Sequence, residues 1–230
     1  MASLIVVLPG EEVPGKEPVG DGEHVVRDGE CISLLAAKRG LKSSDVFAHP
    51  SNDALRAFRP NLNVLLPGDR VAIRAVEQKD VAKPTNTKNI FSLNDDPVFL
   101  RIQLLDRDQA MKNEPFSLSV GGLKFVGVTK DDGSIAVQVP PSATQGFLSV
   151  GPPDNLLQMN LKLGSMHPVE SDTGVQQRLQ NLGFDCGKID GIIGPRTRGR
   201  IRDFQGKNGL LVNGVVTPET RALLKEKHGC

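Results

Sequence analysis

DGIIGPRT, at residues 190–197, returns later in the chain as NGVVTPET, at residues 213–220. Each copy reads as a tight turn at an Asp-Gly or Asn-Gly pair, then two apolar residues, then a helix that begins on a proline. Upstream, Thr173 and Gln176 have the spacing of a capping box and open a segment with helical apolar periodicity. We therefore expect residues 171–230 to form three short helices joined by two similar loops.

The same segment resembles a known family. VQQRLQNLGF, DGIIGPRT and FQGKNGL, read in that order, are similar to the small three-helix peptidoglycan-binding domain appended to bacterial wall hydrolases. The resemblance covers about a quarter of the chain. Gly199 departs from the pattern, because it stands where a better helix former is usual and costs about 1 kcal/mol relative to Ala. The resemblance implies peptidoglycan as the partner of this module.

Two interpretations of the repeated phrase remain open at this stage. In the first, its residues only build turns and core. In the second, loop amides and a run of arginines on the second helix form a shallow groove for the carboxylates of stem peptides. The candidate ligand-binding residues are Asp190, Gly191, Arg196, Thr197 and Arg200.

A second module is expected at residues 22–76. A strand is predicted at His24–Arg27, a turn at Asp28–Gly29 and a helix from Ile32, and the segment closes on LLPGDRVAI. With RDGE at its front and this closing motif, the segment is similar to the LysM domain, a strand–helix–helix–strand binder of N-acetylglucosamine polymers. The resemblance implies sugar-binding residues in the two loops at Gly29, Glu30, Cys31, Asn61 and Asn63.

This second resemblance has departures that leave an alternative open. Glu30–Cys31 replaces the usual Asp-Thr or Asp-Ser, and the stretch AHPSNDALRAFRPNLN is longer than the family's second-loop region. A thiol is a poor substitute for a sugar-binding hydroxyl, and Cys is often simply a small buried apolar residue. The module would then dock a protein instead of a glycan.

The middle of the chain alternates between apolar and polar residues, which predicts several short strands and a small β-sandwich over residues 97–164. It resembles transthyretin-like or Ig-like modules and is expected to act as a spacer. The fold class is therefore multi-domain α+β: a βααβ LysM-like module, a central β-sandwich and a three-helix module. The remaining segments are an arm at 1–21, with a short strand at 4–8, and linkers at 77–96 and 165–170.

Composition and charge further limit the partners and cofactors that the sequence predicts. The 230 residues carry 28 Lys plus Arg against 27 Asp plus Glu, a balance that speaks against nucleic acid as a partner. No apolar run approaches a membrane span, so membrane insertion is not expected. Three scattered cysteines favour no disulfide framework and no metal site, and no cofactor motif is present. The N-terminal apolar run is too short for a secretion signal, which predicts cytoplasmic synthesis and export to the periplasm or wall by a specialised machine.

No catalytic constellation can be assembled from the sequence, so we expect a protein that is not an enzyme. The leading hypothesis is a non-catalytic peptidoglycan-binding protein with two wall-binding modules. The module order is also similar to accessory proteins of contractile injection machines, such as type VI secretion systems or phage-like tails. The alternative is therefore a structural or cargo adaptor of such a machine, in which the LysM-like module docks a tail protein.

Overall fold

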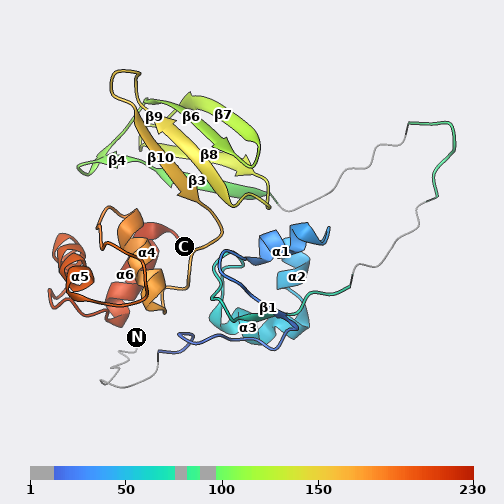
Figure 1. Cartoon of the computed structure of the whole chain (residues 1–230), viewed down its shortest axis with the longest axis horizontal. Helices are drawn as coiled ribbons and strands as arrows, with labels where there is room; N and C mark the ends of the chain where they lie inside the picture. Colours follow the sequence, from blue (N-terminus) through green and yellow to red (C-terminus); the bar gives the residue numbers. More distant parts are fainter. Residues whose placement is uncertain (1–12, 76–81, 89–96) are drawn as a thin grey trace, which may run out of the picture.

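The computed structural model describes residues 13–75, 82–88 and 97–230, and the strand expected at residues 4–8 lies outside them. Three compact parts follow one another along the chain (Figure 1). Helices and one small sheet form the first part, antiparallel sheets form the second, and three helices form the third. The molecule is therefore a mixed α+β protein.

The N-terminal part has the predicted order of a strand, helices and a strand, with extra helical turns in the long second loop. Its two short strands pair antiparallel and its apolar helix faces, including Ile32, Leu35 and Leu55, surround one core. The turn before the first helix forms as predicted, since Glu30 N donates to Arg27 O at 3.0 Å. The elements are β1 (His24–Val25), α1 (Ile32–Lys38), α2 (Ser43–Phe47), the 3-10 turn η1 (Pro50–Asn52), α3 (Asp53–Phe58) and β2 (Arg70–Val71).

A buried ion pair holds this part to the segment that precedes it. Arg59 and Asp69 are 1% and 0% exposed, and Arg59 Nε donates to Asp69 Oδ2 at 2.8 Å. The same guanidinium donates to the carbonyls of Gly15 and Glu17, and Asp69 accepts from Val19 N. Residues 15–19, expected to belong to an arm, are thereby fastened to the N-terminal core.

The central part consists of antiparallel sheets, as the period-two pattern predicts. The order of the larger sheet is β10-β9-β6-β7, β3 pairs with β8, and β4 pairs with β5. The inward side chains of the two larger sheets, Leu118, Leu148 and Ile135 among them, share one core. The strands are β3 (Val98–Gln103), β4 (Leu105–Asp106), β5 (Gln109–Ala110), β6 (Pro115–Val120), β7 (Leu123–Val128), β8 (Ser134–Val139), β9 (Gln145–Val150) and β10 (Leu157–Lys162).

The C-terminal part contains the three expected helices, α4 (Asp172–Asn181), α5 (Pro195–Lys207) and α6 (Pro218–His228). Two details differ from the sequence expectation. Ser171, not Thr173, caps α4, because its hydroxyl accepts from Gly174 N at 3.0 Å. The sequence also predicts Ala222, Leu223 and Leu224 as the buried face of α6; the buried residues are Leu224 and Thr220, and Ala222 is exposed.

The first and third parts lie against each other although the second part separates them in sequence (Figure 1). Lys16 Nζ lies 3.7 Å from Asp172 Oδ2, and His167 Nε2 lies 3.2 Å from Asp28 Oδ1. The helical part also contacts the sheets, since Lys207 of α5 pairs with Asp108. Residues 165–170 therefore run through a junction of packed parts.

Candidate functional site

A buried glutamine organises the first of the two repeated loops. Gln176, 1% exposed on α4, accepts from Asp190 N at 3.1 Å and from Gly191 N at 2.7 Å. Its amide nitrogen lies 3.1 Å from both Asp190 Oδ1 and Ile192 O. Gly191 has φ +76°, a conformation that few side chains adopt without strain. The loop 190–192 is thus wrapped around one side-chain amide.

The second loop is built in the same way around Gln205 of α5. This glutamine, also 1% exposed, accepts from Asn213 N at 3.1 Å and from Gly214 N at 2.9 Å. Its Nε2 donates to Asn213 Oδ1, Val215 O and the buried Thr220 hydroxyl. The sequence repeat is therefore a structural repeat of a helix, a glutamine clamp and an Asx-Gly loop.

Three of the predicted ligand residues are part of the first clamp. Asp190 and Gly191 bond Gln176, and Thr197 is 3% exposed with its hydroxyl 3.5 Å from the same amide nitrogen. Hydrogen bonds from Ile192 N and then from Gln176 hold the pKa of Asp190 below its usual range. These residues shape the loop, and its exposed rim is what a ligand would meet.

We expect Asp190→Asn to weaken the acid sensitivity of the helical part. The pKa of Asp190 is lowered in the folded state, so its contribution is present above the unfolded pKa and is lost as pH falls through the folded one. Asn213 occupies the equivalent place in the second loop, so the turn accepts an amide. Circular dichroism melting at pH 7 and pH 3 should show a similar midpoint at neutral pH and a smaller acid shift. An unchanged acid shift would contradict this role.

The arginines of α5 lie on its exposed side and fall into two groups. Arg196 pairs with Asp185, and Arg200 Nη1 lies 2.6 Å from Asp203 Oδ2. A hydrogen bond from Gly187 N, followed by the charge of Arg196, lowers the pKa of Asp185. Arg198 and Arg202 have no carboxylate within ion-pair distance among the residues that the structure describes. These two arginines belong to the run named in the second interpretation of the sequence, and they carry the uncompensated charge.

Exposed apolar side chains flank these arginines. Ile192 is 67% exposed and Val215 is 51% exposed, so the β-branched pairs of the two loops each leave one residue on the surface. Leu211 and Val212, between α5 and the second loop, are 80% and 55% exposed. The surface formed by loops 189–193 and 210–216 with Arg198 and Arg202, here called the loop surface, can bind a ligand that is partly apolar and partly anionic.

The chain also contains a cysteine, histidine and asparagine in a row, which the sequence analysis missed. His228 Nδ1 lies 3.1 Å from Cys230 Sγ, and Asn181 Nδ2 lies 3.0 Å from His228 Nε2. Burial raises the pKa of the Cys230 thiol; burial and then the charge of Arg178 lower the pKa of His228. Both shifts favour the neutral pair, whereas a nucleophile needs the thiolate. The row therefore gives no support for catalysis.

The N-terminal candidates occupy two neighbouring loops. Glu30 accepts from His24 Nε2 at 2.9 Å and from Arg27 N; these bonds outweigh partial burial, so that the pKa of Glu30 lies below its usual range. Cys31 is 5% exposed and burial raises its pKa. Asn61 Oδ1 accepts from Asn63 N at 2.9 Å, as in an Asx turn. Of these five residues, Gly29 (φ +80°), Glu30 and Cys31 therefore shape the first loop, and the asparagines shape the second.

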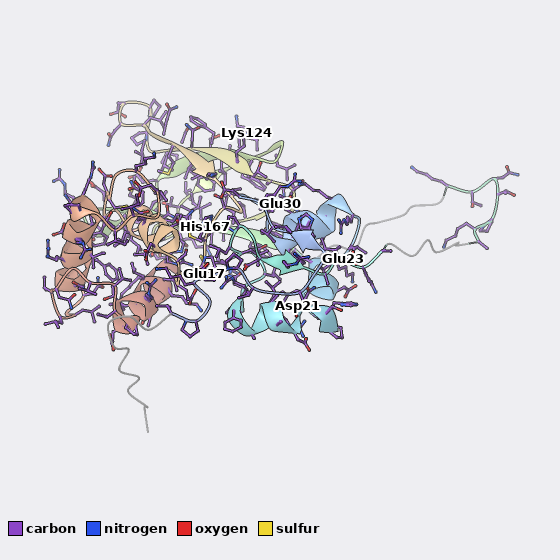
Figure 2. All side chains as sticks on the ribbon, turned by 60° about the horizontal axis from the view of Figure 1, so that its bottom comes forward. Glu17, Asp21, Glu23, Glu30, Lys124 and His167 are labelled. Carbon is purple, nitrogen blue, oxygen red and sulfur yellow. The ribbon has the colours of Figure 1, made fainter. Side chains whose placement is uncertain are left out.

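The first of these loops is covered by the linker between β10 and α4. Asp28 contacts His167 and lies 3.8 Å from Lys162 Nζ. A methyl group on Gly164 would lie 3.7 Å from both Cys31 Sγ and Gly29 O. Figure 2 labels Glu30 on the N-terminal part and His167 beside the helical part. A glycan could reach this loop only beside, or in place of, the linker.

Two further features concern possible metal sites and membrane spans. Among the described residues no three His, Cys, Asp or Glu side chains gather as a metal site would require. No helix in the described ranges is long and apolar enough to cross a membrane.

Comparison with known proteins gives the same assignment for one part of the chain. Residues 173–224 match the family described as "Putative peptidoglycan binding domain". The spore cortex-lytic enzyme of Halalkalibacterium halodurans is 42% identical over 52 residues, which are 23% of this chain and 16% of that protein. The N-acetylmuramoyl-L-alanine amidase CwlM of Mycobacterium tuberculosis is 41% identical over 46 residues, 20% of this chain and 11% of the amidase.

A third similar protein, the "Putative OxPP cycle protein OpcA" of Nostoc punctiforme, is 33% identical over 101 residues, 44% of this chain and 17% of that protein. The chain thus covers less than a fifth of the length of each of these relatives. No solved structure matches the chain. The C-terminal helical part, residues 173–224, is a peptidoglycan-binding domain of the family that also occurs in cell-wall lytic enzymes.

Proposed function

We propose that the protein is a non-catalytic peptidoglycan-binding protein whose C-terminal module contacts the wall through its loop surface. The observation that carries this proposal is the family match at residues 173–224, together with the exposed apolar and cationic side chains on that same module. Stem peptides carry carboxylates and apolar alanine methyl groups, which suit arginine and aliphatic partners. The similarity to lytic enzymes is confined to this module, so it supports binding and not hydrolysis.

Co-sedimentation with purified sacculi tests the proposal. We expect the full chain to pellet with sacculi, and the double variant Arg198→Gln/Arg202→Gln to bind roughly three- to tenfold more weakly, as for the loss of exposed charge contacts. Higher salt should weaken sacculus binding of the parent chain more than that of the variant, because salt screens the arginine charges that only the parent chain carries. Arg39→Gln/Arg101→Gln, at exposed positions outside the helical part, is the charge-matched control. The loop surface is refuted as the contact if the parent chain does not pellet with sacculi. It is also refuted if the control variant loses as much binding as the double variant.

We further propose that residues 22–76 form a LysM-like module and that the sandwich sets its distance from the wall. The β1–helices–β2 order and the RDGE and LLPGDRV motifs support the first assignment. The shared core of two antiparallel sheets supports an Ig-like or transthyretin-like spacer. Release of soluble fragments from sacculi by the purified protein would contradict the non-catalytic assignment.

A second candidate function is that of an adaptor whose LysM-like module docks protein. Its support is the linker on the first loop, where Asp28 pairs with His167 and Gly164 lies beside the buried Cys31. Contractile injection machinery is the class of partner that the module order suggests. In that case deletion of residues 13–75 would leave sacculus binding intact and abolish co-purification with the machine.

A further inference from the structure

A cavity lies at the junction of the first and third parts. It has a volume of about 380 Å³, within the ~300–1,000 Å³ typical of small-molecule sites. One wall comes from the end of α3 and the following loop, including Phe58 and Asn61; the other comes from Glu170, α4 and α6. Figure 2 shows His167 and Glu17 between the N-terminal and C-terminal helices.

The C-terminal wall supplies two cationic side chains, Arg178 and Lys225, and the carboxylate of Glu170 beside them. Arg178 is 1% exposed, and its contacts are the main-chain oxygens of Cys230 (2.9 Å), His167 (2.8 Å) and Gly174 (2.9 Å). Among the described residues no Asp or Glu lies within ion-pair distance of it or of Lys225. Burial lowers the pKa of Arg178, the expected cost of a charge removed from water. The negative charge of Glu170 offsets part of that cost, and an anion in the cavity would offset more of it.

The N-terminal wall supplies an apolar face and a free amide. Phe58 is 44% exposed although it lines the cavity, and it can stack on the flat face of a sugar ring. The Oδ1 of Asn61 is engaged by Asn63 N, which leaves its Nδ2 to donate to a ligand oxygen. Arg59 also lines the cavity, but Asp69 neutralises it. Glu170 is the one acidic side chain among the described lining residues.

From this combination we propose that the junction cavity binds a carboxylate-bearing amino sugar, that is, a muropeptide fragment. Phe58 packs on the ring, Asn61 donates to the acetamido or hydroxyl oxygen, and Arg178 with Lys225 faces the carboxylate. The site exists only where the two wall-binding modules meet, so neither module alone contains it. The inference rests on the proposed peptidoglycan binding and assigns that binding a second, composite site.

The test is a titration of the full isotope-labelled chain followed by amide chemical shifts. The probe is N-acetylmuramoyl-L-alanyl-D-isoglutamine, and tri-N-acetylglucosamine, which lacks a carboxylate, is the comparison ligand. We expect shifts at residues 57–64 and 168–178 with the muramoyl probe, and at least fivefold weaker binding of the neutral sugar. Phe58→Ala and Lys225→Gln should each weaken binding of the muramoyl probe about three- to tenfold. Phe99→Ala and Lys227→Gln, at exposed places away from the cavity, are the matched controls.

Two results would overturn the composite site. One is binding of the probe that moves only amides of the loop surface, or that survives both cavity variants. The other is equal binding of the neutral sugar, which would remove the role of Arg178 and Lys225. Sacculus co-sedimentation separates this failure from that of the proposed function. If the chain still binds sacculi while the probe causes no chemical-shift change at the cavity residues, only the composite site is overturned. Correct folding of each variant is checked by its unchanged spectrum outside the cavity.

Discussion

Asp69→Ala should unfold much of the N-terminal part, at a cost of about 3–5 kcal/mol. The substitution leaves Arg59 charged and 1% exposed without its carboxylate, and breaking a buried pair costs this much because the remaining charge is uncompensated. It also removes the acceptor of Leu66 N and Val19 N. Hydrogen exchange at the amides of α1 and β2 should quicken on the order of a hundredfold or more. The chain has no Trp or Tyr, so exchange serves better than fluorescence.

The matched control for this prediction is Asp53→Ala. Asp53 also pairs with an arginine, Arg56, but its side chain is 67% exposed, and such surface pairs contribute about 1 kcal/mol or less. Replacement of both partners, Arg59→Met with Asp69→Leu, should cost less than the sum of the single changes, because no charge is left alone. Similar amide exchange rates in α1 and β2 of Asp69→Ala and Asp53→Ala would show that the Arg59–Asp69 pair does not hold the N-terminal part together.

Gln205→Leu should destabilise the peptidoglycan-binding module by about 3 kcal/mol or more and weaken its binding to sacculi. Leucine fills nearly the same volume but leaves Asn213 N, Gly214 N and Val215 O without their partner. Each buried group left unsatisfied costs about 1–3 kcal/mol. Amide exchange in loop 210–216 and α6 reports the local effect, and co-sedimentation reports the binding.

Gln180→Leu is the control for the clamp, since it makes the same change at an exposed position of α4 in the same module. Surface changes of this kind usually alter stability by less than about 0.5 kcal/mol. Gln176→Leu, the equivalent clamp position in the first repeat, should behave like Gln205→Leu in loop 189–193. Equal amide exchange rates in loop 210–216 of Gln205→Leu and Gln180→Leu would mean that Gln205 does not organise this loop.

How far the sequence predicted the structure depended on whether the signal was local. Alternating residues predicted short strands within residues 97–164, where β3 to β10 lie, and the Asx-Gly-x-x-x-Pro phrase predicted α5 and α6, since both patterns are read within a few residues. The sequence predicted Thr173 as the cap of α4, which was wrong. Ser171 and Thr173 both have hydroxyls, and only the position of the helix start distinguishes them. The identity of Gln176 as a clamp could have been suggested by its second copy at Gln205, each followed by an Asx-Gly turn.

Contacts between distant segments had no such signal. Arg59 meets Gly15, Glu17 and Asp69, and nothing in the periodicity of α3 distinguishes it from an exposed arginine. The junction cavity likewise joins Phe58 to Arg178, residues whose separation is decided by how whole parts pack. The sequence placed its candidate residues in loops and at the start of one helix, whereas the cavity that joins two parts of the chain came only from the structure.

The contact between the first and third parts makes spatial order differ from chain order. The exposed stretch 82–88 lies between the first and second parts in sequence, outside the junction made by Lys16, Asp172 and His167. Because the entropy of closing a loop grows only with the logarithm of its length, insertions in this stretch would change the junction little. Relatives could therefore lengthen this connection, or place another unit within it, and still preserve the same pairing of modules.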